Sequence, residues 1–149
     1  MKRIALLIIL LVVVGTATAW TDGDFGLGIV LGQPTGITAK YWLGVSSSID
    51  GAVAWSFVHN GSLYLHTDYQ HYLFDIAAVQ SGRLGFFLGL GGRVLFADDF
   101  NLGVRVPLGL IYLFSDVPLD LFLEAAPVLE LLPATAASGG AAIGLRYYF

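Results

Sequence analysis

The chain of 149 residues contains no cysteine, and only 12% of its residues are charged. The absence of cysteine excludes disulfides and thiolate metal sites. Soluble domains usually carry about 25% charged residues, so this chain has roughly half the usual fraction. By contrast, 56% of its residues are hydrophobic. Such a composition is typical of proteins that lie in a membrane.

Long hydrophobic runs and basic residues are also scarce. After Val14, glycine, proline or a charge interrupts every apolar run before it reaches the length of about 18–20 residues that a transmembrane helix needs. Transmembrane helices are therefore not expected. Without Lys2 and Arg3, five basic residues stand against eleven acidic ones. This acidic balance lacks the basic footprint of nucleic-acid binding, so we expect no nucleic-acid partner.

The first nineteen residues have the pattern of a secretory signal peptide. A positively charged start precedes the apolar run Ile4–Val14, and Ala17–Ala19 provides a small-residue cleavage site. A retained membrane anchor is the alternative, but the run is short for crossing a bilayer. We expect a signal peptide over residues 1–19 and a single domain over residues 20–149.

Hydrophobic residues recur with a period of two, which is the pattern of β-strands. In one example, Leu119, Leu121 and Leu123 alternate with Asp120 and Glu124. Eight segments of nine to thirteen residues show this alternation: Asp24–Gly32, Gly36–Gly44, Ile49–Phe57, Leu63–Phe74, Leu84–Phe96, Leu102–Phe114, Leu119–Leu131 and Ala141–Phe149. Tilted strands of this length cross a bilayer, and a closed barrel satisfies every backbone group in lipid. We predict an all-β fold, an eight-stranded antiparallel transmembrane β-barrel of the outer-membrane type.

The connections between these segments are short and carry turn-forming residues. With both ends of the domain in the periplasm, the first, third, fifth and seventh connections face the exterior. Leu132–Gly140 is the largest of these predicted outer loops. Pro107 and Pro127 fall inside predicted strands, where proline removes a ladder hydrogen bond. We therefore expect bulges or strand ends at both prolines.

The final segment places apolar and aromatic residues on one face. Leu145, Tyr147 and Phe149 alternate with Arg146 and Tyr148. Outer-membrane barrels carry aromatic residues at the membrane interface. We expect Leu145, Tyr147 and Phe149 to form an assembly signature that the barrel-assembly machinery recognises. The outward face of the barrel would contact outer-membrane lipid.

The inward face of the predicted barrel collects most of the charged residues. We predict a charge network there, formed by Lys40, Asp50, Asp68, Arg93, Arg105, Asp120, Glu124, Glu130 and Arg146. An eight-stranded barrel is just wide enough for side chains to fill it, and buried charges require partners. The preferred interpretation is an ion-paired plug. A narrow polar pathway for a small solute is the alternative.

The motifs that would carry chemistry are weak. Gly26–Gly28 and Gly89–Gly92 precede no helix and no P-loop lysine, so nucleotide binding is not expected. His59, His66 and His71 have no metal-binding spacing. His66 and Asp68 share one face and could be a ligand pair, although a hydrogen bond inside the barrel is the preferred interpretation. We predict no metal site and no cofactor.

A Ser-His-acid hydrolase on the barrel wall, as in lipid-modifying outer-membrane enzymes, is the catalytic alternative. His71 faces outward, and serines cluster at Ser46–Ser48 and at Ser62, but no spacing connects them. We therefore predict no catalytic residue. A soluble, lipocalin-like carrier is a further alternative, and its strands would turn their polar faces outward.

Several stretches resemble a family of small, uncharacterised bacterial outer-membrane β-barrel proteins, noted in spirochaetes among others. These stretches are Gly32–Gly36 followed by Lys40–Trp42, then Gly89–Arg93, Arg105–Gly109, Phe122–Val128 and Gly144–Phe149. The resemblance implies the barrel, with both prolines as features of it, and implies no activity. Some family members are thought to bind host proteins through surface loops. The loops here are short, so an external protein partner stays open. We expect a structural or surface-interaction role.

Overall fold

The computed structural model describes residues 23–56 and 61–149, so the predicted signal peptide lies outside the described residues. The described residues form nine strands: β1 (Phe25–Gly32), β2 (Gly36–Trp42), β3 (Ser47–Ser56), β4 (Ser62–Phe74), β5 (Arg83–Phe96), β6 (Phe100–Arg105), β7 (Leu108–Leu113), β8 (Leu119–Leu132) and β9 (Ala136–Tyr148). None of the described residues belongs to an apolar helix of membrane-spanning length.

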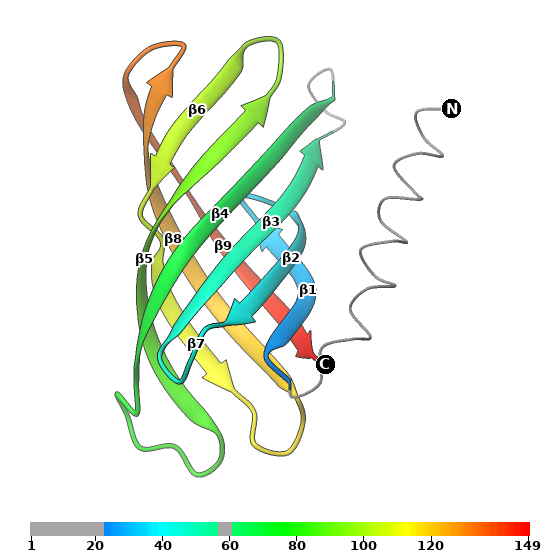
Figure 1. Ribbon diagram of the computed structural model, residues 1–149, viewed down its shortest axis with the longest axis vertical. Helices are drawn as coiled ribbons and strands as arrows, with labels where there is room; N and C mark the ends of the chain where they lie inside the picture. Colours follow the sequence, from blue (N-terminus) through cyan, green and yellow to red (C-terminus); the bar gives the residue numbers. More distant parts are fainter. Residues whose placement is uncertain (1–22, 57–60) are drawn as a thin grey trace, which may run out of the picture.

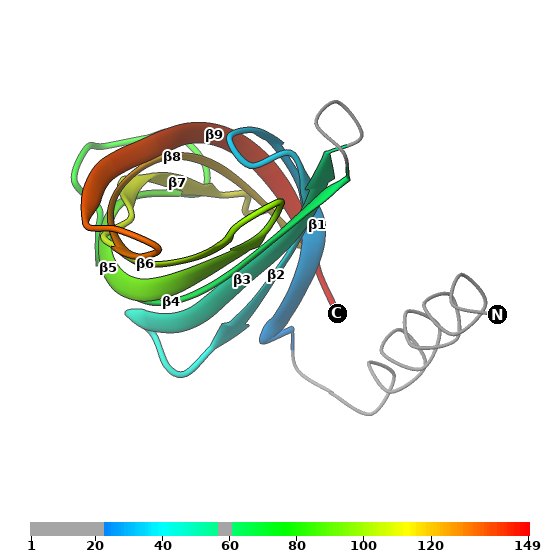
Figure 2. The same cartoon turned by 90° about the horizontal axis from the view of Figure 1, so that it is seen from above.

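The strands form one antiparallel sheet that closes on itself (Figures 1 and 2). Strands β1 to β5 pair in chain order, β8 pairs with β9, and β9 pairs with β1. The short strands β6 and β7 lie end to end in one position between β5 and β8. The described sheet is therefore a ring of eight strand positions. The predicted all-β, antiparallel arrangement of eight strands is confirmed.

Pro107 lies at the break between β6 and β7. Proline has no N–H to donate to the ladder, and strand pairing stops at Arg105 and resumes at Leu108. The register does not change across the break, because Arg105 lies opposite Gly91 and Leu108 lies opposite Leu88. The strand end predicted at Pro107 is confirmed, and the interruption is local.

Pro127 lies inside β8, and the prediction of a bulge or strand end there is wrong. Strand β8 continues through it, with Pro127 opposite Gly139 of β9. Its backbone faces the break between β6 and β7, where its carbonyl accepts a hydrogen bond from the N–H of Val106 at 3.0 Å. Pro127 has no backbone N–H, and the hydrogen bond that it cannot make would lie at this break, where neither β6 nor β7 pairs with β8. The two prolines share one interruption of the sheet.

Strands β8 and β9 are longer than predicted. Strand β9 begins at Ala136, and the ladder already pairs that residue with Glu130. The connection consists of residues 133–135 alone, so the prediction that Leu132–Gly140 is the largest outer loop is wrong. The alanines, glycines and serine of this segment have weak strand preference. Pairing along β8 overrides that preference.

Side chains alternate between the inside and the outside of the ring. Strand β8 shows this most regularly, because Leu121 and Leu123 are exposed while Asp120, Phe122 and Glu124 are buried. Every Asp, Glu, Lys and Arg in the described strands has the inward parity. The last residue of the predicted segment Ile49–Phe57 lies outside the described residues. The buried apolar cluster inside the ring consists of Val30, Ala52, Tyr72, Phe87, Ile111, Phe122 and Ala142.

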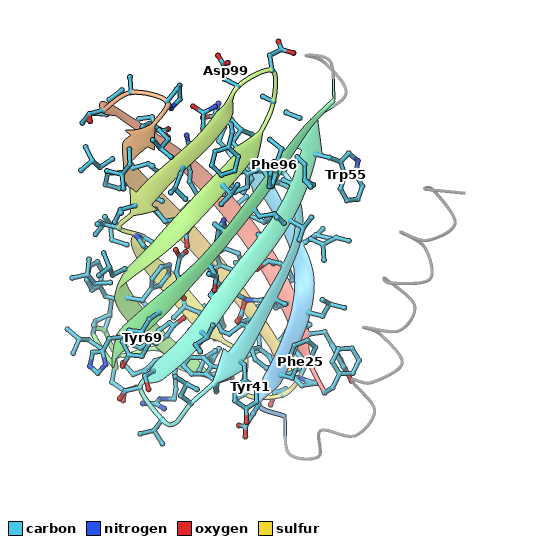
Figure 3. All side chains as sticks on the ribbon, turned by 45° about the horizontal axis from the view of Figure 1, so that its top comes forward. Phe25, Tyr41, Trp55, Tyr69, Phe96 and Asp99 are labelled. Carbon is cyan, nitrogen blue, oxygen red and sulfur yellow. The ribbon has the colours of Figure 1, made fainter. Side chains whose placement is uncertain are left out.

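Aromatic side chains lie toward both ends of the outer surface (Figure 3). Toward the end where β1 begins and β9 finishes, the outward aromatics include Phe25, Tyr41, Tyr69, Tyr147 and Phe149. Toward the opposite end they include Trp55, Phe96 and Phe100, which occupy linked registers on neighbouring strands. Between the two groups the outward positions are mainly aliphatic, and Ile29, Leu90 and Leu123 are among the exposed residues.

The seam that closes the ring depends on a close approach of β1 to β9. Gly28 lies opposite Arg146 across this seam. A Cβ atom at Gly28 would lie 1.8 Å from the carbonyl oxygen of Leu145, and that oxygen belongs to backbone that cannot move alone. A side chain at this position would therefore push the two strands apart.

We expect Gly28→Ala to lower the free energy of unfolding by about 1–3 kcal/mol, the usual cost of overpacking. Denaturant unfolding of the folded protein measures the change. Gly92→Ala is the matched control, because the nearest atom to a Cβ there is 3.8 Å away. If Gly28→Ala unfolds at the same denaturant concentration as the parent, the close seam is contradicted.

Candidate functional site inside the ring

The strand registers bring the inward charged residues together across the ring. Lys40 lies opposite Asp50, and Asp50 lies opposite Asp68 on the next strand. On the other side of the ring, Asp120 lies opposite Arg146. Because these positions share the inward parity, the structure places all nine residues of the predicted charge network inside the ring.

Arg146 is the centre of one cluster. Its guanidinium forms ion pairs with Asp50 and with Asp120, and its Nε lies 3.1 and 3.2 Å from the two carboxylate oxygens of Asp120. The same guanidinium stacks 3.9 Å above the ring of Phe122. The hydroxyl of Tyr148 donates a hydrogen bond to Asp120. Both carboxylates around Arg146 are therefore compensated.

Arg105 is the centre of a second cluster. Its Nε lies 2.9 Å from Asp68, and its Nη2 forms an ion pair with Glu124. Its Nη1 donates to the hydroxyl of Tyr64 at 2.8 Å and lies 3.1 Å from Nδ1 of His66. Arg105 is 1% exposed. A buried guanidinium with five donors is thus surrounded by acceptors from two other strands, β4 and β8.

Arg93 and Glu130 form a third, separate ion pair. It is the least buried of the three, with 16% and 10% of the two side chains exposed. Ser138 donates a second hydrogen bond to Glu130 at 2.6 Å. Eight of the nine predicted network residues therefore belong to ion pairs.

Lys40 is the exception, since the described residues place no carboxylate within ion-pair distance of its Nζ. The ammonium donates to the hydroxyl of Tyr72 instead. It lies 4.6 Å from the ring centre of Tyr72 and 5.1 Å from that of Trp42. Aromatic faces attract a cation, most strongly when water is excluded. The aromatic surroundings thus take the place of an acidic partner.

Sequence reasoning missed the aromatic layer around Lys40. Tyr72 stacks on Phe74, with ring centres 5.6 Å apart, and it contacts Trp42 and Phe87. These rings come from β2, β4 and β5, and they belong to the buried apolar cluster or pack against it. Outside the layer, a cavity of 350 Å³ is lined by Trp42, Phe74, Arg83 and four further residues. The inward parity of the aromatic residues was the only signal that could have predicted the layer.

The catalytic alternative is not assembled in the structure. Ser47 lies opposite His71 on the outward face, but the described residues show no hydrogen bond between them and no acid beside them. Ser48 faces inward instead and contacts the hydroxyl of Tyr72 at 3.1 Å. The serines of the cluster are therefore divided between the two faces.

The assembly signature and the glycine motifs also have defined positions. Leu145 and Tyr147 face outward on β9, and Phe149 follows the strand and donates its N–H to the carbonyl of Phe25. Gly26–Gly28 lies within β1 and Gly89–Gly92 lies within β5. Neither glycine motif forms a loop, so neither can cradle a phosphate.

Comparisons with protein-family models, with curated proteins and with solved structures found no match. The resemblance to small outer-membrane barrels therefore stays a prediction. The function must be inferred from the interior network and from the outer surface.

We expect Arg105→Leu to lower the free energy of unfolding by about 3–5 kcal/mol, because it leaves buried carboxylates uncompensated. Chemical denaturation measures the difference. Arg83→Leu is the control, since Arg83 pairs with Asp75 at the exposed end of β5 and such pairs contribute only about 0–1 kcal/mol. If the two variants lose the same small amount, Arg105 is not the centre of an ion-pair network.

Proposed function

We propose that the chain is an outer-membrane β-barrel with a plugged, ion-paired interior and a structural or surface-interaction role. The observation that carries this proposal is the distribution of charge. In the described strands every charged side chain has the inward parity, whereas the outward positions are mostly aliphatic or aromatic. A protein dissolved in water gains no stability from charged side chains inside and apolar side chains outside. A protein surrounded by lipid needs this arrangement.

The outer surface supports the same proposal in a second way. Aromatic residues lie toward both ends and aliphatic residues lie between them (Figure 3). Transmembrane barrels carry an apolar band flanked by two aromatic girdles. The predicted signal peptide at residues 1–19 fits export to the bacterial outer membrane, and the face formed by Leu145, Tyr147 and Phe149 would be read by the assembly machinery.

The interior favours a plug over a channel. Arg105 and Arg146 are each only 1% exposed, and the aromatic rings of Trp42, Tyr72, Phe74 and Phe87 pack together inside the same ring of strands. A conducting pore needs hydrated polar groups along its whole length. We further propose that this role is not enzymatic.

Planar-bilayer recording of the purified protein tests the plug. We expect no protein-dependent current, since the arginine clusters and the rings of Tyr72 and Phe87 are almost fully buried inside the ring of strands. A porin reconstituted in the same way is the positive control. Steady unitary currents that occur more often as the protein concentration rises would favour the alternative function, a narrow channel for small solutes.

We expect Leu123→Arg to destabilise the protein in lipid by about 2–4 kcal/mol, because it places a charge on the lipid face. Val45→Arg is the matched control, since Val45 is 88% exposed in the connection between β2 and β3. Unfolding in lipid vesicles measures both. In a water-exposed protein both changes would be nearly neutral, so a neutral Leu123→Arg contradicts the membrane proposal.

A further inference from the structure

Three buried side chains of β3 and β4 point at a common spot inside the ring. Nε2 of His66 lies 3.5 Å from a carboxylate oxygen of Asp50 and 3.6 Å from one of Asp68. The three side chains are at most 4% exposed. These separations are long for hydrogen bonds. They match the distances of about 3.3–3.6 Å between neighbouring ligand atoms of a tetrahedral metal ion with bonds of about 2.0–2.2 Å.

The hydrogen bonding of Asp68 is a second, independent observation at this spot. Both of its carboxylate oxygens are buried and have no hydrogen-bond partner among the described residues. Nε of Arg105 lies 2.9 Å from one oxygen but without hydrogen-bond geometry. Asp68 also lies directly opposite Asp50, and like charges at opposite positions repel. Asp68 is thus a buried carboxylate that pairs with Arg105 through Oδ2 alone, and its demand for hydrogen-bond donors is not met.

We propose that Asp50, His66 and Asp68 bind a divalent metal ion that accepts one nitrogen and two oxygen ligands, with Zn²⁺ or Co²⁺ as examples. The three ligand atoms, one from each residue, lie within 4.8 Å of one another. Imidazole and carboxylate are ordinary ligands of these ions. The site was not predictable from spacing, because Asp50 reaches it from the neighbouring strand.

Metal binding would affect the contacts that Arg146 and Arg105 make with the three proposed ligands. Arg146 pairs with the Oδ2 atom of Asp50 and leaves Oδ1 facing His66. Such an outer contact orients a ligand without occupying its binding atom. Arg105 lies 3.1 Å from Nδ1 of His66, and a metal on Nε2 moves the ring hydrogen to Nδ1. Arg105 must then release His66 and also Oδ2 of Asp68, which its Nε contacts at 2.9 Å, while it keeps Tyr64 and Glu124.

Titration of the untagged, metal-free protein with CoCl₂ in detergent tests the site. We expect about one Co²⁺ per chain and visible absorption bands of low-symmetry, four-coordinate Co²⁺. His66→Asn should weaken binding at least tenfold. His71→Asn is the matched control, since His71 lies on the same strand and faces outward, and it should bind like the parent. Far-UV circular dichroism verifies that each variant is folded.

A second measurement needs no variant. In the parent protein, the imidazole nitrogen NMR signals of His66 should shift on addition of Zn²⁺, and those of His71 should not. Absence of bound Co²⁺, or equal binding by His66→Asn, overturns the proposal, and so does an unshifted His66 signal. The membrane proposal is untouched by these results, because it rests on the outward face.

Discussion

A charged group that is enclosed by a ring of strands must find its partner on another strand of the same ring. Arg146 and Arg105 show how strictly this requirement applies, because each is 1% exposed and each pairs with two carboxylates from other strands. A slip of one residue in any of these strands would turn a charge outward and leave its partner unpaired. The ion pairs therefore specify the register of the sheet, as well as its inside and outside.

The fold was largely predictable because one signal, the period of two, determines both the strands and their faces. Alternation along Leu119–Leu131 assigned the inward acids without any knowledge of neighbours. The prediction failed at Leu132–Gly140, where small residues carry no alternation and only the pairing with β8 makes them a strand. It also failed at Pro127, because the tolerance of that proline depends on the break beside Pro107.

The alternation of residues along each strand predicted which charged side chains lie inside the ring, but it did not predict which of them pair with one another. Sequence pattern cannot tell that Arg105 contacts Asp68 and Glu124, or that Lys40 lies among aromatic rings instead of beside an acid. Those contacts depend on register across strands that are distant in the chain. The grouping of Asp50 with His66 and Asp68 has the same origin. The register of the closed sheet thus determines which side chains meet inside the ring.

The central proposal is that the closed sheet exposes its apolar side chains to lipid and encloses its charged side chains. Because the chain has no cysteine, nitroxide labels on single introduced cysteines along β8 can measure the environment of each position in lipid vesicles. Labels at Leu121, Leu123 and Leu129 should be accessible to oxygen and protected from a water-soluble relaxation agent. Labels at Phe122, Ala126 and Val128 should be protected from both. Strong accessibility of the first three positions to the water-soluble agent would contradict the account.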